Sequence, residues 1–160
     1  MNKFYTVANK VFTDNGAWID NFVGDKVIAL YIPGFAGKDH TYLAIKSAVE
    51  LLEATGHSST KGPWVPLGIG INTRDVFMGA VGSGNITDIT PLGDNVNVTA
   101  RLSSEAKTGE IVISNSPYNS PICKAPSSQK LLQQLQIQKK SVELKGKSEP
   151  QNIYIGSMSG

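Results

Sequence analysis

Asn97 and Arg101 are the residues in this sequence whose types and spacing most directly suggest chemistry. They lie four residues apart within the stretch 87–106, and residues at that spacing share one face of a helix. An amide beside a guanidinium places a neutral donor and acceptor next to five fixed donors, a set that suits a sugar and a phosphate. In the structural alternative, Arg101 pairs with Glu105 one turn along and Asn97 is solvated. For this helix taken alone, the structural alternative is favoured.

A carboxylate and two lysines elsewhere in the chain could complete such a site. Gly24 and Asp25 separate two apolar runs, and a two-residue Gly-x connection predicts a tight β-hairpin with Asp25 exposed at its tip. Ordinary turn chemistry would also explain Asp25. Lys145 and Lys147 flank a glycine in a turn near the C-terminus. Carboxylates hold Mg²⁺, and Arg and Lys hold phosphates, so together these residues predict a nucleoside triphosphate site.

Other chemistries lack the residues that they need. His40 and His57 have no Cys, His or Glu at metal-ligand spacing, so no transition-metal site is predicted. Neither a G-x-S-x-G elbow nor a Walker A motif occurs in the sequence. The G-x-G pairs at 68–70 and 82–84 do not continue to a third glycine at dinucleotide spacing. We interpret them as strand and turn glycines.

The composition favours one globular domain that spans residues 1–160. Hydrophobic residues make up 40% of the chain and charged residues 18%, an ordinary balance for a packed core. A net charge of +2 argues against nucleic acid as a partner. The single cysteine, Cys123, cannot form an internal disulfide, and no apolar run is long enough to span a bilayer. We therefore expect a cytoplasmic domain without membrane contact, on its own or as part of a larger, membrane-attached protein.

Hydrophobic periodicity and turn residues predict the elements that position these side chains. A first helix ends at Asn15-Gly16, and a second begins after Asp39 and ends at Gly56. A third begins at Asp94 or Asn95, buries Val98, Leu102 and Ala106, and ends at 108–109. The strands are predicted as three pairs and one single strand: 17–23 with 26–32, 67–71 with 76–81, 138–144 with 151–155, and 110–113 alone. Residues 82–93 are predicted to be a loop.

This order predicts an α+β fold. Two successive helix–strand–strand units favour helices packed on one face of a mostly antiparallel sheet. The arrangement is ferredoxin-like, a βαββαβ pattern that begins at its first helix, so that the first strand is expected to be missing.

Six segments of the chain, taken together, resemble the catalytic domain of class III nucleotidyl cyclases, the adenylate and guanylate cyclase family. The resemblance runs over residues 3–155, and each segment alone is a weak signal. In order and at the family's spacing they are GAWIDNFVGD at 16–25, LGIGINT at 67–73, GAVGS at 79–83, LGDNVNVTARL at 92–102, GEIVIS at 109–114 and LKG at 144–146.

The resemblance implies a purine nucleotide cyclase that converts ATP to cyclic AMP and pyrophosphate. Two Mg²⁺ or Mn²⁺ ions per site are implied, with Asp25 matching the second of the family's two metal-binding aspartates. Asn97 matches the residue that orients the ribose, and Arg101 matches the arginine that stabilises charge on the α-phosphate. Lys145 matches the lysine that binds the terminal phosphates, and Lys147 is a less favoured substitute. The sites are shared, so a homodimer is implied, with Asp25 of one copy facing Asn97 and Arg101 of the other.

Several positions depart from the family pattern. The family's first metal aspartate lies on the strand that precedes the first helix, so this chain alone is not expected to be fully active. Asn21 stands where adenylate cyclases usually have Lys, and Thr90 stands where many have Asp. A threonine at this position is similar to the subgroup that includes cyanobacterial and bicarbonate-responsive cyclases. ATP is favoured over GTP. Arg74 replaces the usual glycine of an Asn-Thr-Gly turn, without a functional account. The alternative is a degenerate cyclase-homology module that dimerises or binds nucleotide for regulation.

Overall fold

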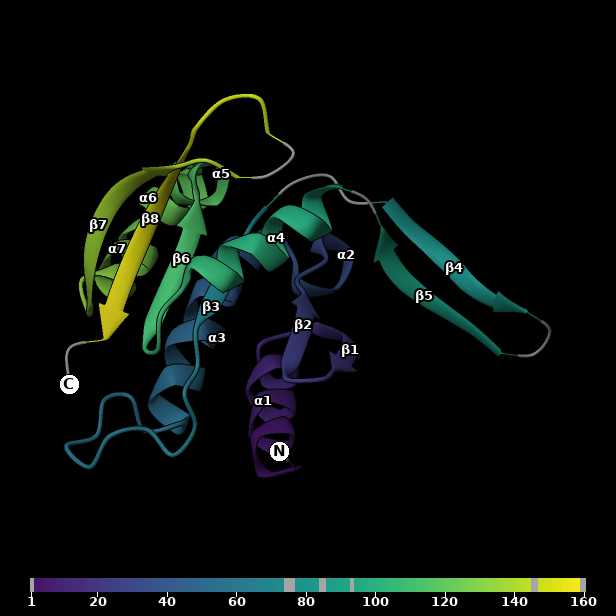
Figure 1. The fold of residues 1–160 in the computed structure, drawn as a ribbon, viewed down its shortest axis with the longest axis horizontal. Helices are drawn as coiled ribbons and strands as arrows, with labels where there is room; N and C mark the ends of the chain where they lie inside the picture. The colour runs from purple at the N-terminus through teal and green to yellow at the C-terminus, as the bar shows by residue number, and fades with distance from the viewer. Residues whose placement is uncertain (1, 74–76, 84–85, 93, 145–146, 159–160) are drawn as a thin grey trace.

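Residues 2–73, 77–83, 86–92, 94–144 and 147–158 are described by a computed structural model (Figure 1). Helix α1 (Asn2–Asp14) buries Phe4, Ala8 and Phe12, which recur every four residues on one helix face. It stops at Gly16, whose φ of 81° lies in the left-handed region that glycine adopts without strain. The predicted first helix and its end are therefore confirmed.

The predicted hairpin follows directly after α1. Strands β1 (Trp18–Val23) and β2 (Lys26–Leu30) pair antiparallel around Gly24 and Asp25, and Gly24 has a φ of 61°. The inner faces of these strands pack against α1 through Ile19, Val27 and Ala29. The hairpin thus packs against the body of the molecule through α1.

Helix α3 (His40–Ala54) is the central helix of the fold. It follows the short helix α2 (Pro33–Ala36) and is preceded by Asp39, as predicted, although the Asp39 side chain makes no capping hydrogen bond. Leu51 packs toward α1, while Ile45 and Leu52 pack toward a four-stranded sheet. Because two of its faces are buried, α3 joins the hairpin to that sheet.

The four-stranded sheet has the order β3–β6–β8–β7. The β3–β6 pair is parallel, while β6–β8 and β7–β8 are antiparallel. The strands have these bounds: β3 Ile69–Ile71, β6 Glu110–Ser114, β7 Leu135–Val142 and β8 Gln151–Met158. The mostly antiparallel α+β architecture that the sequence predicts is confirmed.

Helices lie on both faces of this sheet, which corrects the expectation of helices on one face. Ile111, Val112 and Ile113 are each 0% exposed, so β6 is buried on both sides. Ile111 and Ile113 contact the cluster around α3, whereas Val112 contacts α4 (Asp94–Glu105). Figure 1 shows α4 crossing in front of β3 and β6, with α3 behind them. A continuous apolar run requires a cover on each face, and α4 supplies the second one.

The pairing predicted for residues 67–81 and the loop predicted for 82–93 are wrong. Strand β3 pairs with β6, and β4 (Phe77–Ser83) pairs instead with β5 (Ile86–Leu92) in an antiparallel hairpin. Figure 1 shows this second hairpin extending away from the rest of the molecule. The Ile and Thr residues of β5 favour a strand, but the flanking glycines and a proline obscured that signal.

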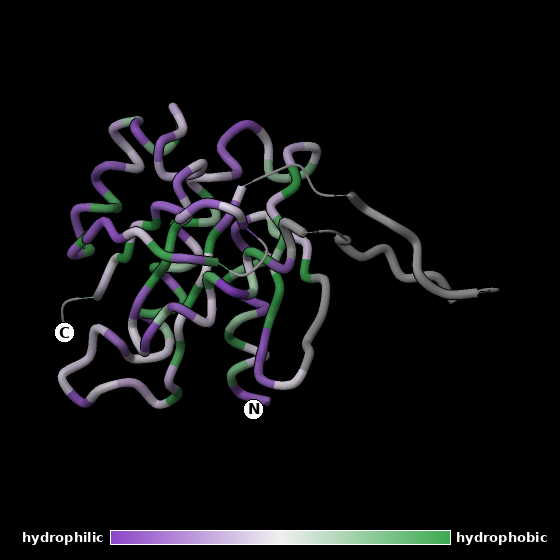
Figure 2. Tube along the Cα trace, turned by 45° about the horizontal axis from the view of Figure 1, so that its top comes forward, coloured by the Kyte–Doolittle hydropathy of each residue, from purple (hydrophilic) through white to green (hydrophobic). Residues whose placement is uncertain are grey.

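Three short helices connect β6 to β7 and cover the same sheet face as α3. They are α5 (Asn115–Tyr118), α6 (Pro121–Lys124) and α7 (Pro126–Leu132), in a stretch predicted to be irregular with one or two helical turns. Cys123 and Leu132 bury themselves against the α3 cluster. Figure 2 shows the hydrophobic stretches concentrated inside the body, between helices and sheet. None of the helices in the described part of the chain has the length and hydrophobicity needed to cross a bilayer.

Candidate functional site

Helix α4 carries the two residues that suggested chemistry in the sequence. Val98 is 8% exposed and Leu102 is 0% exposed, and both pack against Val112 of β6. Successive helical residues are rotated by about 100°, so the residues just before these two lie together on the neighbouring flank. Asn97 is accordingly exposed, and Arg101 is half-buried beside it. The buried stripe therefore fixes which way both polar side chains face.

The structural alternative for Arg101 is not found. Between described residues, ion pairs form from Lys10 to Asp14 at 2.8 Å and from Lys46 to Glu50 at 2.6 Å. Neither pair involves Arg101, and its guanidinium is not bridged to Glu105 one turn along. The guanidinium is therefore available to an anionic ligand.

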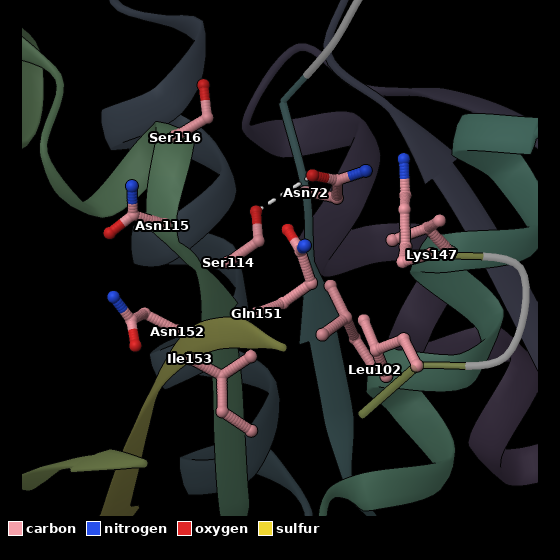
Figure 3. A pocket seen from close by; sticks show the side chains of 11 residues that line it. Asn72, Leu102, Ser114, Asn115, Ser116, Lys147, Gln151, Asn152 and Ile153 are labelled. Atoms are coloured by element: carbon pink, nitrogen blue, oxygen red, sulfur yellow. Dashed lines mark hydrogen bonds between the residues drawn. The ribbon is translucent and has the colours of Figure 1, made fainter. Parts of the chain in front are cut away.

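A small polar pocket lies beside the buried face of α4 (Figure 3). Leu102 and Ile153 line its floor, and Ser114, Gln151 and Lys147 present polar groups around it. The cavity volume is about 30 Å³. A single water needs about 10–15 Å³, so the pocket has room for two or three waters or for the tip of a larger ligand.

Asn72 and Ser114 hold the wall of this pocket together. The Ser114 hydroxyl donates a hydrogen bond of 2.8 Å to the Asn72 side-chain oxygen, as the dashed line in Figure 3 marks. Asn72 follows β3 and Ser114 ends β6, so the bond joins the carboxyl ends of two parallel strands. Ligands of sheets with parallel strands commonly bind at this edge.

Sequence reasoning assigned no role to Asn72 or Ser114. Each is a polar residue directly after an apolar strand, which is a usable signal only when the two strands are known to be neighbours. Strands β3 and β6 are about forty residues apart in the sequence, and no turn motif between them predicts that they pair.

The two candidate phosphate-binding lysines differ in what the structure describes. Lys145 lies outside the described residues, as does Arg74. Lys147, the less favoured of the two in the sequence, is exposed at the pocket, and its backbone N–H donates to the carbonyl of Leu144 at 3.0 Å. Since Leu144 packs against Leu102, this loop is anchored to α4.

Asn21 and Thr90, the two candidate base-reading positions, lie on strands that contact one another. The backbone of Asn21 on β1 pairs with Ile28, after a register irregularity that follows Ile19. The backbone of Thr90 on β5 pairs with Gly79. The two strands that carry these positions, β1 and β5, contact each other.

Asp25 lies at the tip of the β1–β2 hairpin, which also carries Asn21. It is exposed at the β1–β2 turn, which the Tyr5 hydroxyl anchors by donating to the carbonyl oxygen of Gly24. Figure 1 places this turn beside α1, away from the end of α4 that follows β5. The β1–β2 hairpin packs on α1, whereas α4 contacts β3, β5 and β6, so Asp25 and the Asn97–Arg101 pair are carried by different parts of the fold.

The donor set at Asp25 suits a magnesium ion only in part. No group of three metal-ligating side chains occurs among the described residues. Mg²⁺ is commonly held by one or two carboxylates while substrate phosphates and waters complete its shell. An exposed Asp25 fits that pattern as one ligand.

The sequence matches a known family over nearly its whole length. The model of the adenylate and guanylate cyclase catalytic domain matches residues 5–156. The terminal-differentiation specific adenylate cyclase of Dictyostelium discoideum is 30% identical over 157 residues, which cover 96% of this chain and 7% of that protein. The adenylate cyclase of Anabaena cylindrica is 30% identical over 165 residues, which cover 96% of this chain and 31% of that protein. The chain thus spans less than a third of either relative.

A solved structure of similar fold leads to the same family. The guanylyl cyclase Cya2 aligns with a TM-score of 0.78 and 25% sequence identity, over 99% of this chain and 79% of that chain. The similarity therefore extends to proteins named for either purine nucleotide.

Proposed function

This chain belongs to the adenylate and guanylate cyclase catalytic-domain family, and on that premise we propose that it is the catalytic domain of a purine nucleotide cyclase. The proposed reaction converts ATP to cyclic AMP and pyrophosphate. The observation that carries it is the flank of α4, where Asn97 is exposed and Arg101 has no ion pair with a described residue. A guanidinium and an amide fixed on one helix suit an α-phosphate and its ribose.

The proposed step is an intramolecular displacement. The ribose 3′-oxygen forms a bond to the α-phosphorus, the bond from that phosphorus to the α–β bridging oxygen breaks, and pyrophosphate leaves with the electron pair. The 3′-hydroxyl proton passes to water. Asn97 orients the ribose, and Arg101 stabilises the negative charge that grows on the α-phosphate oxygens. Lys145 binds the terminal phosphates, with Lys147 as a second cation on the same loop.

Asp25 is the metal-binding residue of this proposal. Mg²⁺ or Mn²⁺ at the site supplies charge neutralisation on the triphosphate and a lowered pKa for the ribose hydroxyl. Asp25 contributes a carboxylate from the exposed hairpin tip, where it is free to reach a neighbouring molecule.

We propose a homodimer with shared sites. The proposal is supported by the position of the β1–β2 turn, which lies beside α1 and away from the start of α4 (Figure 1), so that a second copy would supply Asp25 to Asn97 and Arg101. The β4–β5 hairpin supports this arrangement, because a two-stranded ribbon is marginal alone and is stabilised by a partner surface.

ATP is the proposed substrate, and a single cytoplasmic domain over residues 1–160 is the proposed organisation. Asn21 is a neutral donor and acceptor for a base edge and lacks the charge of lysine. Thr90 adds a hydroxyl on the neighbouring strand. The curated relatives above are named as adenylate cyclases, which favours ATP over GTP.

The second candidate is a cyclase-homology module without activity. Two observations favour it: the neutral Asn21 at a base-reading position, and the lack of any group of three metal-ligating side chains within the described part of the chain. Such a module would dimerise or bind nucleotide and act as a regulator.

The test measures cyclic nucleotide from ATP and from GTP with Mn²⁺ in the whole natural protein. We expect cyclic AMP from ATP, and we expect Arg101→Ala to lower kcat about 10²–10³-fold, the effect of losing one transition-state donor. The control is Lys139→Ala, an exposed lysine of β7 remote from α4. Absence of both cyclic products, together with retained nucleotide binding, would favour the inactive module.

A further inference from the structure

Helix α4 rests directly on the backbone of β3 and its preceding residue at two glycines. A methyl group at Gly70 would lie 2.5 Å from the Ser103 backbone nitrogen and 2.9 Å from the Ser103 Cα. A methyl group at Gly68 would lie 2.6 Å from the Ala106 carbonyl oxygen and 2.9 Å from its Cβ. Cβ atoms do not approach backbone this closely, so only glycine permits the observed contact at either position.

Glycine is required at positions 68 and 70 because there is no room for a side chain, and not because of an unusual backbone conformation. The described glycines with positive φ are Gly16, Gly24, Gly37, Gly56, Gly62 and Gly109. Gly68 and Gly70 are not among them, so any residue could adopt their backbone angles. The sequence-based interpretation as strand and turn glycines therefore lacks the reason for their presence, which is the helix above them.

The two contacts fix the helix at two points. Gly68 and Gly70 are two residues apart, so their missing side chains face the same side of the strand. Gly70 touches α4 at Ser103, in its last turn, and Gly68 touches Ala106, the residue that directly follows the helix. These contacts set how closely the C-terminal end of α4 approaches the strand.

The contacts lie just beyond the proposed catalytic residues on the same helix. Arg101 precedes Ser103 by two residues, and Asn97 lies about one further turn away. An added methyl at Gly70 needs a separation of about 3.4 Å in place of 2.5 Å, a shift of about 1 Å. The obstacle is backbone, which cannot rotate aside as a side-chain end can.

We propose that Gly68 and Gly70 are positioning residues: they let α4 pack closely against the strand and thereby set the distance of Asn97 and Arg101 from the substrate. This inference rests on the proposed function, because it requires Asn97 and Arg101 to act on the substrate. Displacing a catalytic group by about 1 Å commonly costs about 10²-fold in rate. Gly68 and Gly70 therefore affect the turnover rate through the position of α4, without contacting the nucleotide.

The test compares Gly70→Ala with Gly156→Ala in the whole natural protein. The methyl added at Gly156 would meet the Cδ1 atoms of Leu135 at 2.9 Å and Ile137 at 3.0 Å, which are flexible side-chain ends. Both belong to the α3 side of the sheet, away from α4. Gly156→Ala thus perturbs packing to a comparable distance without moving the helix.

Two readouts are needed, kcat and KM for ATP, and hydrogen exchange of the α4 amides. We expect Gly70→Ala to lower kcat about 10–100-fold, to change KM less than about threefold, and to speed exchange in α4. Gly156→Ala is expected to keep kcat within about twofold and to leave exchange in α4 unchanged. Equal losses of kcat in the two variants at matched thermal stability would overturn the proposal.

The outcomes separate this inference from the proposed function. If the natural protein makes no cyclic nucleotide, the proposed cyclase function is wrong. Hydrogen exchange of the α4 amides then decides whether the two glycines position the helix. If it is active and Gly70→Ala retains full kcat, the inference fails while the function stands. If Gly70→Ala does not fold, Gly68→Ala replaces it, with a smaller expected loss of kcat because Gly68 contacts Ala106, just after the end of α4.

Discussion

Arg101 is available for chemistry because of where its neighbours on α4 are buried. Leu102 is fully buried and turns the adjacent side chain to the rim of the sheet, where no described carboxylate neutralises it. The sequence contains both the pattern and its alternative, since Glu105 stands at the spacing of a helical ion pair. Only the three-dimensional arrangement distinguishes a ligand-binding arginine from a paired one.

His57 is a buried residue that the proposed reaction does not use. Its Nδ1 lies 2.9 Å from the Thr55 hydroxyl, which donates to the Leu51 carbonyl at 2.7 Å. The ring nitrogen therefore donates to Thr55, and Nε2 is left as a buried acceptor without a partner. Burial lowers the pKa of His57 from 6.5, because the charged ring would lose its water.

This environment predicts acid sensitivity of folding. The unfolded chain takes up a proton as the pH falls below about 6.5, whereas the folded chain resists it until the pH falls through its lower pKa. His57 thus contributes no pH dependence above about 7, and the free energy of unfolding declines between the two pKa values. Urea unfolding from pH 5 to pH 8 measures this.

The matched variant for that measurement is His57→Gln, which cannot titrate. It is expected to be less stable at neutral pH but to have a flatter profile between pH 5 and pH 7. A decline of the same steepness in both proteins would show that other groups cause the acid sensitivity.

Secondary-structure elements were predictable where their signals are local. Helix α1, the hairpin with Gly24 at its turn and the buried stripe of α4 all follow from periodicity and turn residues. Strand β3 was found, but its partner was not, because a parallel neighbour lies far along the chain. The β4–β5 hairpin was missed because its strands contain several glycines and a proline. Local sequence predicts elements, and distant packing decides how they pair.

The β1–β2 turn offers a test of one local signal. Gly24 has a φ of 61°, and a methyl group there would meet nothing within 4 Å. Gly24→Ala therefore isolates the backbone cost of the left-handed conformation, about 1–2 kcal/mol of unfolding free energy. Gly34→Ala is the control, since Gly34 has equal space and no positive φ. Urea unfolding of both variants should show a loss at Gly24 only; equal losses would contradict this explanation.

Asp25 lies on the β1–β2 hairpin and Arg101 on α4, and the proposed homodimer brings them together from two copies. This arrangement predicts that two inactive variants, when mixed, restore cyclase activity. In a shared-site homodimer, Asp25→Asn and Arg101→Ala each remove activity from both sites. Mixed dimers keep one site with neither change, because one copy supplies Asp25 and the other supplies Arg101. An equal, freely exchanging mixture should recover about a quarter of the original cyclase activity, from random pairing of subunits.

The control for this experiment is each variant alone, at the same total protein concentration as the mixture. Recovery of activity only in the mixture indicates sites built from two copies. No recovery, in a mixture shown by mass to contain mixed dimers, would place both residues in a site within one copy.

One residue separates the end of β5 at Leu92 from the start of α4 at Asp94. Seven residues of strand span about 23 Å, so the β4–β5 ribbon is a long arm attached almost directly to the helix. In the proposed homodimer, a partner that packs on the β4–β5 ribbon would contact the segment that leads directly into the helix with Asn97 and Arg101. Substitutions far out on the ribbon are therefore expected to change cyclase turnover through dimerisation, although they lie away from the nucleotide.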